Sequence, residues 1–247
     1  MNKLAWATII ALAGMLPAVA AASPFKEDEE EEGHFTAPTY RYFATQEAAE
    51  AAMHRDLKYV DEMTQHHQGA VDMSRAYLDN PRGTNPFLQR MARAIIFNQQ
   101  FEIAWLEDIK QRESAGSKSA FGLGEVVQLP TGLTGYEHRA RFQKAPILSV
   151  TEPISTQRPS DYDVMFAKAM KMHHQMALDM AQVYNDDPAG ENRVIREINR
   201  GILRDQTLEI GILSDLIAQY PGDADAIEIP AEMHEMMGMP HDMSHGS

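Results

Sequence analysis

The chain repeats a set of residues at a constant spacing of 107 positions, and no other feature restricts the possible folds as strongly. His66 and His67 recur as His173 and His174, since 173 minus 66 and 174 minus 67 both give 107. The same spacing relates further residues on both sides of a shared Pro-x-Gly turn: Met63 and Met170, Met73 and Met180, Gln99 and Gln206, Glu102 and Glu209. No insertion interrupts this register, so the fold must contain two equivalent halves.

Each half reads as two helices joined by the turn. Thr45 suits the N-cap of a first helix that reaches Leu78, and Asn85 followed by Pro86 is typical of the start of a second, which runs to about Arg112. The third helix starts at Ser160, and the fourth covers about 191–219. A helical hairpin cannot bury its apolar face alone, so the sequence predicts an all-α four-helix bundle made of two repeated hairpins, for which the crossover arrangement of ferritin-like bundles is open.

The connection between the hairpins is unusually long and rich in Gly, Ser, Pro and Thr. Its length suffices to run along a whole helix, which favours a crossover linker, with short strands around 125–129. The predicted organisation is therefore a signal peptide (1–22), an acidic disordered lead (23–44), the first hairpin (45–113), the linker (114–159), the second hairpin (160–220) and a Met/His-rich tail (221–247).

The first residues predict export. Lys3 precedes an apolar stretch, 4–16, that is short for a bilayer span, and small residues follow Pro17. We expect a cleavable signal peptide and a periplasmic or secreted protein that is not an integral membrane protein after cleavage; the alternative is an uncleaved anchor. The chain has no cysteine, so any soft metal must use methionine sulfur. Its formal net charge of −14 disfavours nucleic acid as a partner.

Helical periodicity places the repeated residues on apolar faces. On the first helix Met63, His66, His67 and Met73 share one stripe with Tyr59 and Tyr77, and the third helix repeats it with Met170, His173, His174 and Met180. Gln99 and Glu102 share an apolar face of the second helix, as Gln206 and Glu209 do on the fourth. Four inward histidines are costly without partners, so we predict metal ligation, with these Glu and Gln side chains orienting the rings.

An alternative explanation is that the histidines bond only those Glu and Gln residues, and that the methionines fill the core. The C-terminal tail favours the metal hypothesis, because it gathers five Met and three His within 233–245: Met233, His234, Met236, Met237, Met239, His241, Met243 and His245. Thioether and imidazole together suit copper(I), and silver(I) by its similar softness, whereas zinc prefers thiolate, imidazole or carboxylate.

The stretch 63–73, Met-Thr-Gln-His-His-Gln-Gly-Ala-Val-Asp-Met, resembles the signature of the domain of unknown function family 305. The run from Ile95 to Ile103 resembles its partner signature, and Met176 stands where the second half would carry the usual glycine. The resemblance covers about 55–110 and 161–216 and does not account for the linker. It implies a ferritin-like four-helix fold, and some members of the family are periplasmic copper-binding proteins involved in copper resistance.

No nucleophile motif, nucleotide-binding loop, haem site or di-iron pattern accompanies these features, so we predict no catalytic residues. The favoured hypothesis is an exported copper(I)/silver(I)-binding protein, not an enzyme, that buffers the metal, confers resistance or transfers it. Its partners would be metal ions and a copper exporter or another periplasmic copper protein. Two alternatives stay open: a copper-dependent oxidoreductase, and a helical interaction scaffold with incidental metal affinity.

Overall fold

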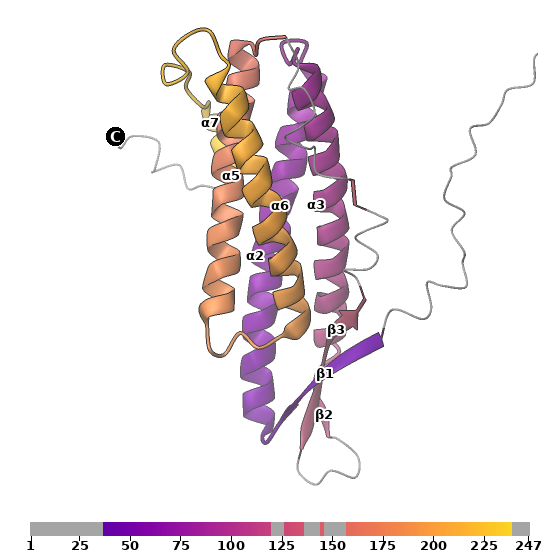
Figure 1. Ribbon diagram of the computed structural model, residues 1–247. Helices are drawn as coiled ribbons and strands as arrows, with labels where there is room; N and C mark the ends of the chain where they lie inside the picture. The colour runs from indigo at the N-terminus through magenta and orange to yellow at the C-terminus, as the bar shows by residue number, and fades with distance from the viewer. Residues whose placement is uncertain (1–36, 120–125, 136–143, 146–156, 239–247) are drawn as a thin grey trace, which may run out of the picture.

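The computed structural model describes residues 37–119, 126–135, 144–145 and 157–238. Four long helices lie side by side as the repeat predicts (Figure 1): α2 (Gln46–Asp79), α3 (Pro86–Glu113), α5 (Asp161–Asp186) and α6 (Arg193–Ala218). Helices α2 and α3 pack as one hairpin and α5 and α6 as the other. The four-helix prediction is confirmed, while the predicted signal peptide and the last residues of the tail lie outside the described residues.

Side-chain caps fix where the helices begin. Thr45 Oγ1 accepts a hydrogen bond from the Ala48 amide, and Ser160 forms a reciprocal capping box with Asp163. Asn85 and Asn192, which are related by the 107-residue spacing, each accept from two amides at the start of α3 and α6. These are local signals, so the sequence located the helix starts within about two residues.

The crossover makes α2 and α5 antiparallel, and two equivalent Tyr–Asp contacts join them. Tyr77, near the end of α2, donates to Asp163 at the start of α5 over 2.6 Å. Tyr184, near the end of α5, donates to Asp56 near the start of α2 over 2.8 Å. Tyr184 follows Tyr77 by 107 residues, and Asp163 follows Asp56 by 107. The two contacts are therefore equivalent, and the two hairpins are related by a pseudo-twofold axis that crosses the middle of α2 and α5.

A small sheet at one end of the bundle corrects the prediction of a lead disordered through residue 44. Strand β1 (Ala37–Phe43) pairs antiparallel with β3 (Val127–Thr134), and β2 (Lys118–Ser119) lies on the other side of β3. Leu129 and Thr131 of β3 are buried, and β3 packs mainly on α3. The acidic run in the sequence predicted disorder. Strand β1 is instead stabilised by pairing with β3, about 90 residues away, and no local pattern reveals that partner.

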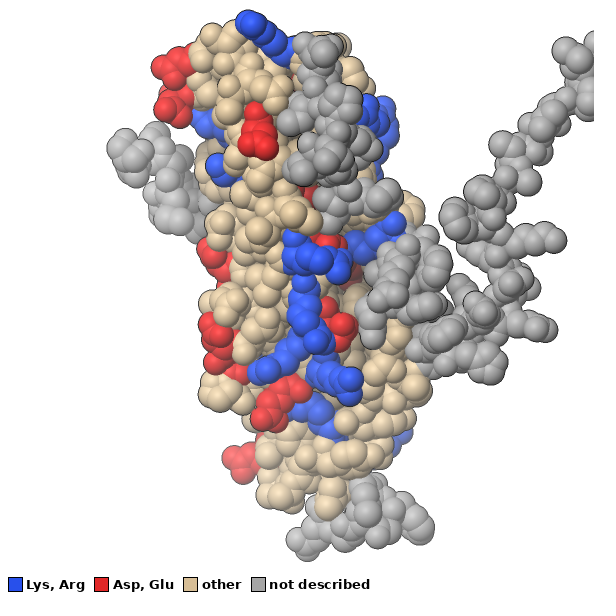
Figure 2. All heavy atoms as spheres, viewed as in Figure 1, with Lys and Arg blue, Asp and Glu red and all other residues tan. Residues whose placement is uncertain are grey.

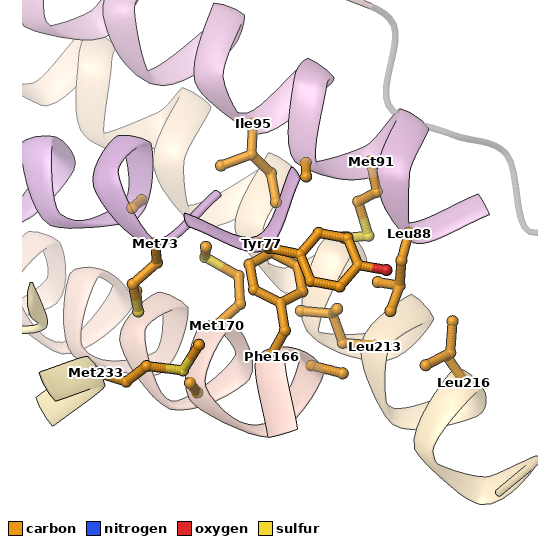
Figure 3. Close-up of a cluster of buried hydrophobic side chains, with 14 of the residues drawn as sticks. Met73, Tyr77, Leu88, Met91, Ile95, Phe166, Met170, Leu213, Leu216 and Met233 are labelled. Carbon is orange, nitrogen blue, oxygen red and sulfur yellow. The ribbon is translucent and has the colours of Figure 1, made fainter. Parts of the chain in front are cut away.

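The tail also contains a short helix that the sequence did not predict. Helix α7 (Ala231–Met236) packs against α2, and Met233 and Met237 are buried there. Figure 3 shows Met233 near Met73 of α2 and Met170 of α5 within one core cluster. Met233 and Met237 therefore have a packing role, which the sequence did not predict.

The surface of α6 is more basic than the net charge suggests. Figure 2 shows Lys and Arg side chains gathered over this helix, where Arg193, Arg200 and Arg204 are exposed. Arg196 donates to the Gly190 carbonyl oxygen in the turn before α6, and Arg204 forms an ion pair with Asp205 of the same helix. Part of this positive charge therefore has a structural role. Among the described residues, none of the helices combines the length and the apolar character that crossing a bilayer requires.

Candidate metal centre

The four predicted histidines meet at the pseudo-twofold axis, halfway along the bundle. The rings of His66 and His173 are 3.7 Å apart between centroids and tilted by 34°. His67 and His174 flank this central pair, with ring centroids 6.3 Å from His66 and 6.2 Å from His173, respectively. His67, His173 and His174 are fully buried and His66 is 7% exposed. Consecutive histidines on α2 and α5 thus form one cluster of four imidazoles.

Each outer histidine lies against a carboxylate from the neighbouring helix of its own hairpin. His67 Nε2 is 2.9 Å from Glu102 Oε2 of α3. His174 Nε2 is 2.8 Å from Glu209 Oε2 of α6, although its N–H is poorly aligned with that oxygen for a hydrogen bond. A carboxylate accepts from Nε2–H, so it leaves the lone pair on Nδ1, the arrangement that orients a ligating histidine in many metal sites.

Lys144 of the linker reinforces this arrangement on one side only. Its ammonium is 2.7 Å from Glu102 Oε1 and 2.9 Å from Asp205 Oδ2, so it bridges α3 and α6. Burial alone would raise the pKa of Glu102, but Lys144 and the bond to His67 outweigh burial and lower that pKa to about 2. Glu102 is therefore a carboxylate, and His67 Nε2 is the donor in their hydrogen bond.

The central pair is neutral. Burial, with the neighbouring His67 and His174, lowers the pKa of His66 to about 3. Burial and His66 lower the pKa of His173 well below its usual value. His173 Nε2 lies 2.8 Å from the His66 carbonyl oxygen, which can only accept, so Nε2 carries the proton and Nδ1 the lone pair. Neutral imidazoles with available lone pairs are the form that binds a metal ion.

Buried ring nitrogens without hydrogen-bond partners distinguish this cluster from an ordinary polar core. Nδ1 of all four histidines has no partner, and neither has Nε2 of His66 or of His174. The predicted role of the two glutamines is not seen: both polar atoms of Gln206, and Oε1 of Gln99, also lack partners. Each such group costs about 1–3 kcal/mol when buried. A cation with free coordination positions would satisfy these nitrogens, so the residues fit a metal.

The predicted methionine ligands have different surroundings. Met63 and Met170, one helical turn before His66 and His173, are fully buried, as is Met73, whereas Met180 is half-buried. Within the tail, Met233 and Met237 are buried and His234 and Met236 are half-buried. The remaining predicted tail ligands lie outside the described residues: Met239, His241, Met243 and His245. The helix-borne methionines thus belong to or pack against the two hydrophobic clusters of the bundle.

Within the described ranges, no three His, Asp or Glu side chains gather in a way that would hold a metal ion by themselves. The central pair supplies two imidazoles, so a site there would need thioether sulfur to complete it. Lys144 and Asp205 were not predicted as parts of the site, and nothing in the sequence pattern marks Lys144, which has no counterpart in the repeat. Asp56, Asp163, Tyr77 and Tyr184 do share the 107-residue spacing, so the repeat could have revealed their pairing.

The fold and the site together define a class: a duplicated helical-hairpin bundle with a buried His/Met interior. The family model described as "Domain of unknown function (DUF305)" matches residues 16–124 and 163–246, which together make up more than half of the chain. The chain therefore belongs to this family. No curated protein and no solved structure matches it.

Proposed function

We propose that this chain binds thiophilic metal ions, copper(I) first and silver(I) second, in the interior of its bundle. The observation that carries the proposal is the set of partnerless Nδ1 atoms on four buried histidines that meet at one axis. Packing alone does not favour such a cluster, because leaving several imidazole nitrogens unsatisfied is costly.

Copper(I) and silver(I) match the donors better than harder ions do. Both accept imidazole nitrogen and thioether sulfur, and both tolerate low coordination numbers. Met63 and Met170 precede His66 and His173 by three residues, so each helix offers sulfur and nitrogen on one face. Zinc would prefer additional imidazole, carboxylate or thiolate ligands, and the chain has no cysteine.

The role that suits these donors is capture and transfer outside the inner membrane. The N-terminal sequence supports export, and the Met/His-rich tail supports exchange of metal with another copper protein or an exporter. We propose a binding protein and not an enzyme, since the donors are buried in the helical interior.

Competitive titration with a copper(I) chelator tests this proposal. The full-length mature chain should remove copper(I) from the chelator in a fixed stoichiometry, and it should bind zinc(II) and copper(II) more weakly. Replacing His66, His67, His173 and His174 by alanine should abolish the tight interior binding, while His54→Ala, an exposed histidine of α2, should leave it unchanged. Circular dichroism would show whether the quadruple variant folds, and the double variant H66A/H173A serves if it does not.

Two results would refute the proposal in favour of the alternatives. Unchanged copper(I) affinity and stoichiometry in a quadruple variant that also lacks residues 231–247 would leave an interaction scaffold with incidental metal affinity. Multiple turnovers of copper(I) oxidation by the copper-loaded chain, lost in H66A/H173A, would indicate an oxidoreductase.

A further inference from the structure

Gly69 of α2 lies directly under helix α7, beside the central histidine pair. A Cβ atom at this position would be 1.9 Å from the Met236 carbonyl oxygen, 3.1 Å from the Met236 carbonyl carbon and 3.3 Å from His173 Nε2. Backbone atoms of α7 therefore occupy the space that any other side chain at Gly69 would need. The same point adjoins His173, so α7 covers one edge of the His66–His173 pair.

Two methionine side chains anchor α7 in this position over Gly69. Met233 is 5% exposed and Met237 1% exposed, and both belong to the core cluster that contains Ala70, Met73 and Met170. Met236 is half-buried and packs against the same cluster, His234 is half-buried, and the other residues of the helix are exposed. A helix of six residues buries little surface, so α7 is an element that can detach without unfolding the bundle.

The glycine that makes room for α7 is present in the first half of the repeat and absent from the second. The position equivalent to Gly69 in the second half is Met176, 107 residues later, and its side chain is half-buried. The second half therefore carries a side chain at the position that must be glycine for α7 to lie where it does in the first half. This is the one position that differs within the His-His-Gln-x-Ala motif, because the residues before and after it are the same in both halves.

We propose that α7, seated on Gly69, is a gate that controls metal entry to and exit from the His66–His173 pair. When seated, its backbone covers the His173 side of the pair. When it lifts, that edge opens, and the thioethers of Met233 and Met237 leave the core with it. This inference rests on the proposed function for the identity of the ligand, but the seating of α7 on Gly69 does not.

Gly69→Ala tests the seat without any metal. The added methyl group would collide with the Met236 carbonyl, so α7 should detach, and the amides of 233–238 should lose protection from hydrogen exchange in the full chain. Gly211→Ala in α6 is the matched control, because Gly211 is also helical and has nothing within 4 Å of its Cβ position. Unchanged protection of α7 in folded G69A protein would refute the inference that α7 packs on Gly69.

Exchange of copper(I) with bathocuproine disulfonate tests the gate. If α7 is seated about 90% of the time or more, its removal should accelerate both uptake and release by roughly tenfold or more. G69A should show this acceleration, and G211A should match the parent chain. Met237→Ser, which loosens α7 while keeping Gly69, should also accelerate exchange and serves if G69A does not fold.

The two proposals fail in different ways. Loss of α7 protection in G69A with copper(I) exchange rates equal to those of G211A would overturn the gate and leave metal binding intact. Absence of copper(I) binding in the parent chain would overturn the proposed function and, with it, the gate, while the hydrogen-exchange result would still decide whether Gly69 seats α7.

Discussion

At the scale of single residues, the buried polar groups of this protein are of two kinds. Asp163 is fully buried and accepts hydrogen bonds from Tyr77, Thr84, Asn85 and Ser160, so the protein itself satisfies it. His66 is also buried, and neither of its ring nitrogens has a partner. A group of the first kind has a structural role: Asp163 joins two helices and a turn. The second kind calls for a ligand, and this contrast separates structural from functional polar residues here.

Glu113 is a carboxyl group whose burial makes stability depend on pH. Burial and the nearby Asp56 raise the pKa of Glu113 to about 9, despite the hydrogen bond that it accepts from Asn192. Burial likewise raises the pKa of Asp56, although Tyr184 and Arg41 oppose the shift. The folded chain therefore holds protons that the unfolded chain releases above its ordinary carboxyl pKa.

From this we predict that the free energy of unfolding falls as the pH rises above the ordinary pKa of Glu113 towards about 9. The slope should approach about 1.4 kcal/mol per pH unit for one proton. Glu113→Gln should flatten the dependence, because an amide stays neutral and can still accept from Asn192. Urea unfolding at several pH values measures it, and an equally steep fall in E113Q would assign the effect to other groups.

At the scale of secondary structure, elements specified by neighbouring residues were predictable and elements specified by distant ones were not. Thr45, Asn85 and Ser160 act within three residues of themselves, so they mark helix starts in the sequence. Strand β1 depends on β3, and α7 depends on the space above Gly69. The histidine cluster was predictable in part, because the repeat and the helical period place it inward, whereas its link to Lys144 depends on the path of the linker.

The two equivalent asparagine caps should differ in strength. Asn85→Ala should lower the free energy of unfolding by about 1–2 kcal/mol, as expected for a lost N-cap. Asn192→Ala should cost more, because its Nδ2 donates both to Glu113 and to the Thr131 carbonyl oxygen, which connects α6 to α3 and β3, whereas Nδ2 of Asn85 donates to the Gln157 carbonyl oxygen. Urea unfolding compares both with Gln175→Ala, an exposed position on α5. Equal costs at 85 and 192 would mean that the contacts of Asn192 beyond the cap add nothing.

At the scale of the whole molecule, the duplication places the functional site where the two halves meet. The Tyr77–Asp163 and Tyr184–Asp56 contacts set α2 and α5 in register at both ends, and that register brings His66 against His173 in the middle. Neither hairpin contains the central pair alone. A metal held there would bridge both hairpins, and its binding energy would add to the stability of the whole bundle.

This coupling gives a prediction about unfolding. Free silver(I) at about 100 times its dissociation constant should raise the free energy of unfolding by about 2.7 kcal/mol, if it binds only the folded chain. Thermal unfolding followed by circular dichroism should move to higher temperature as one transition, because both halves share the ligand. H66A/H173A should lose most of this shift, and His54→Ala should keep it. A silver(I)-induced shift that persists in full in H66A/H173A and disappears on removal of 231–247 would place the stabilising ion on the tail rather than between the hairpins.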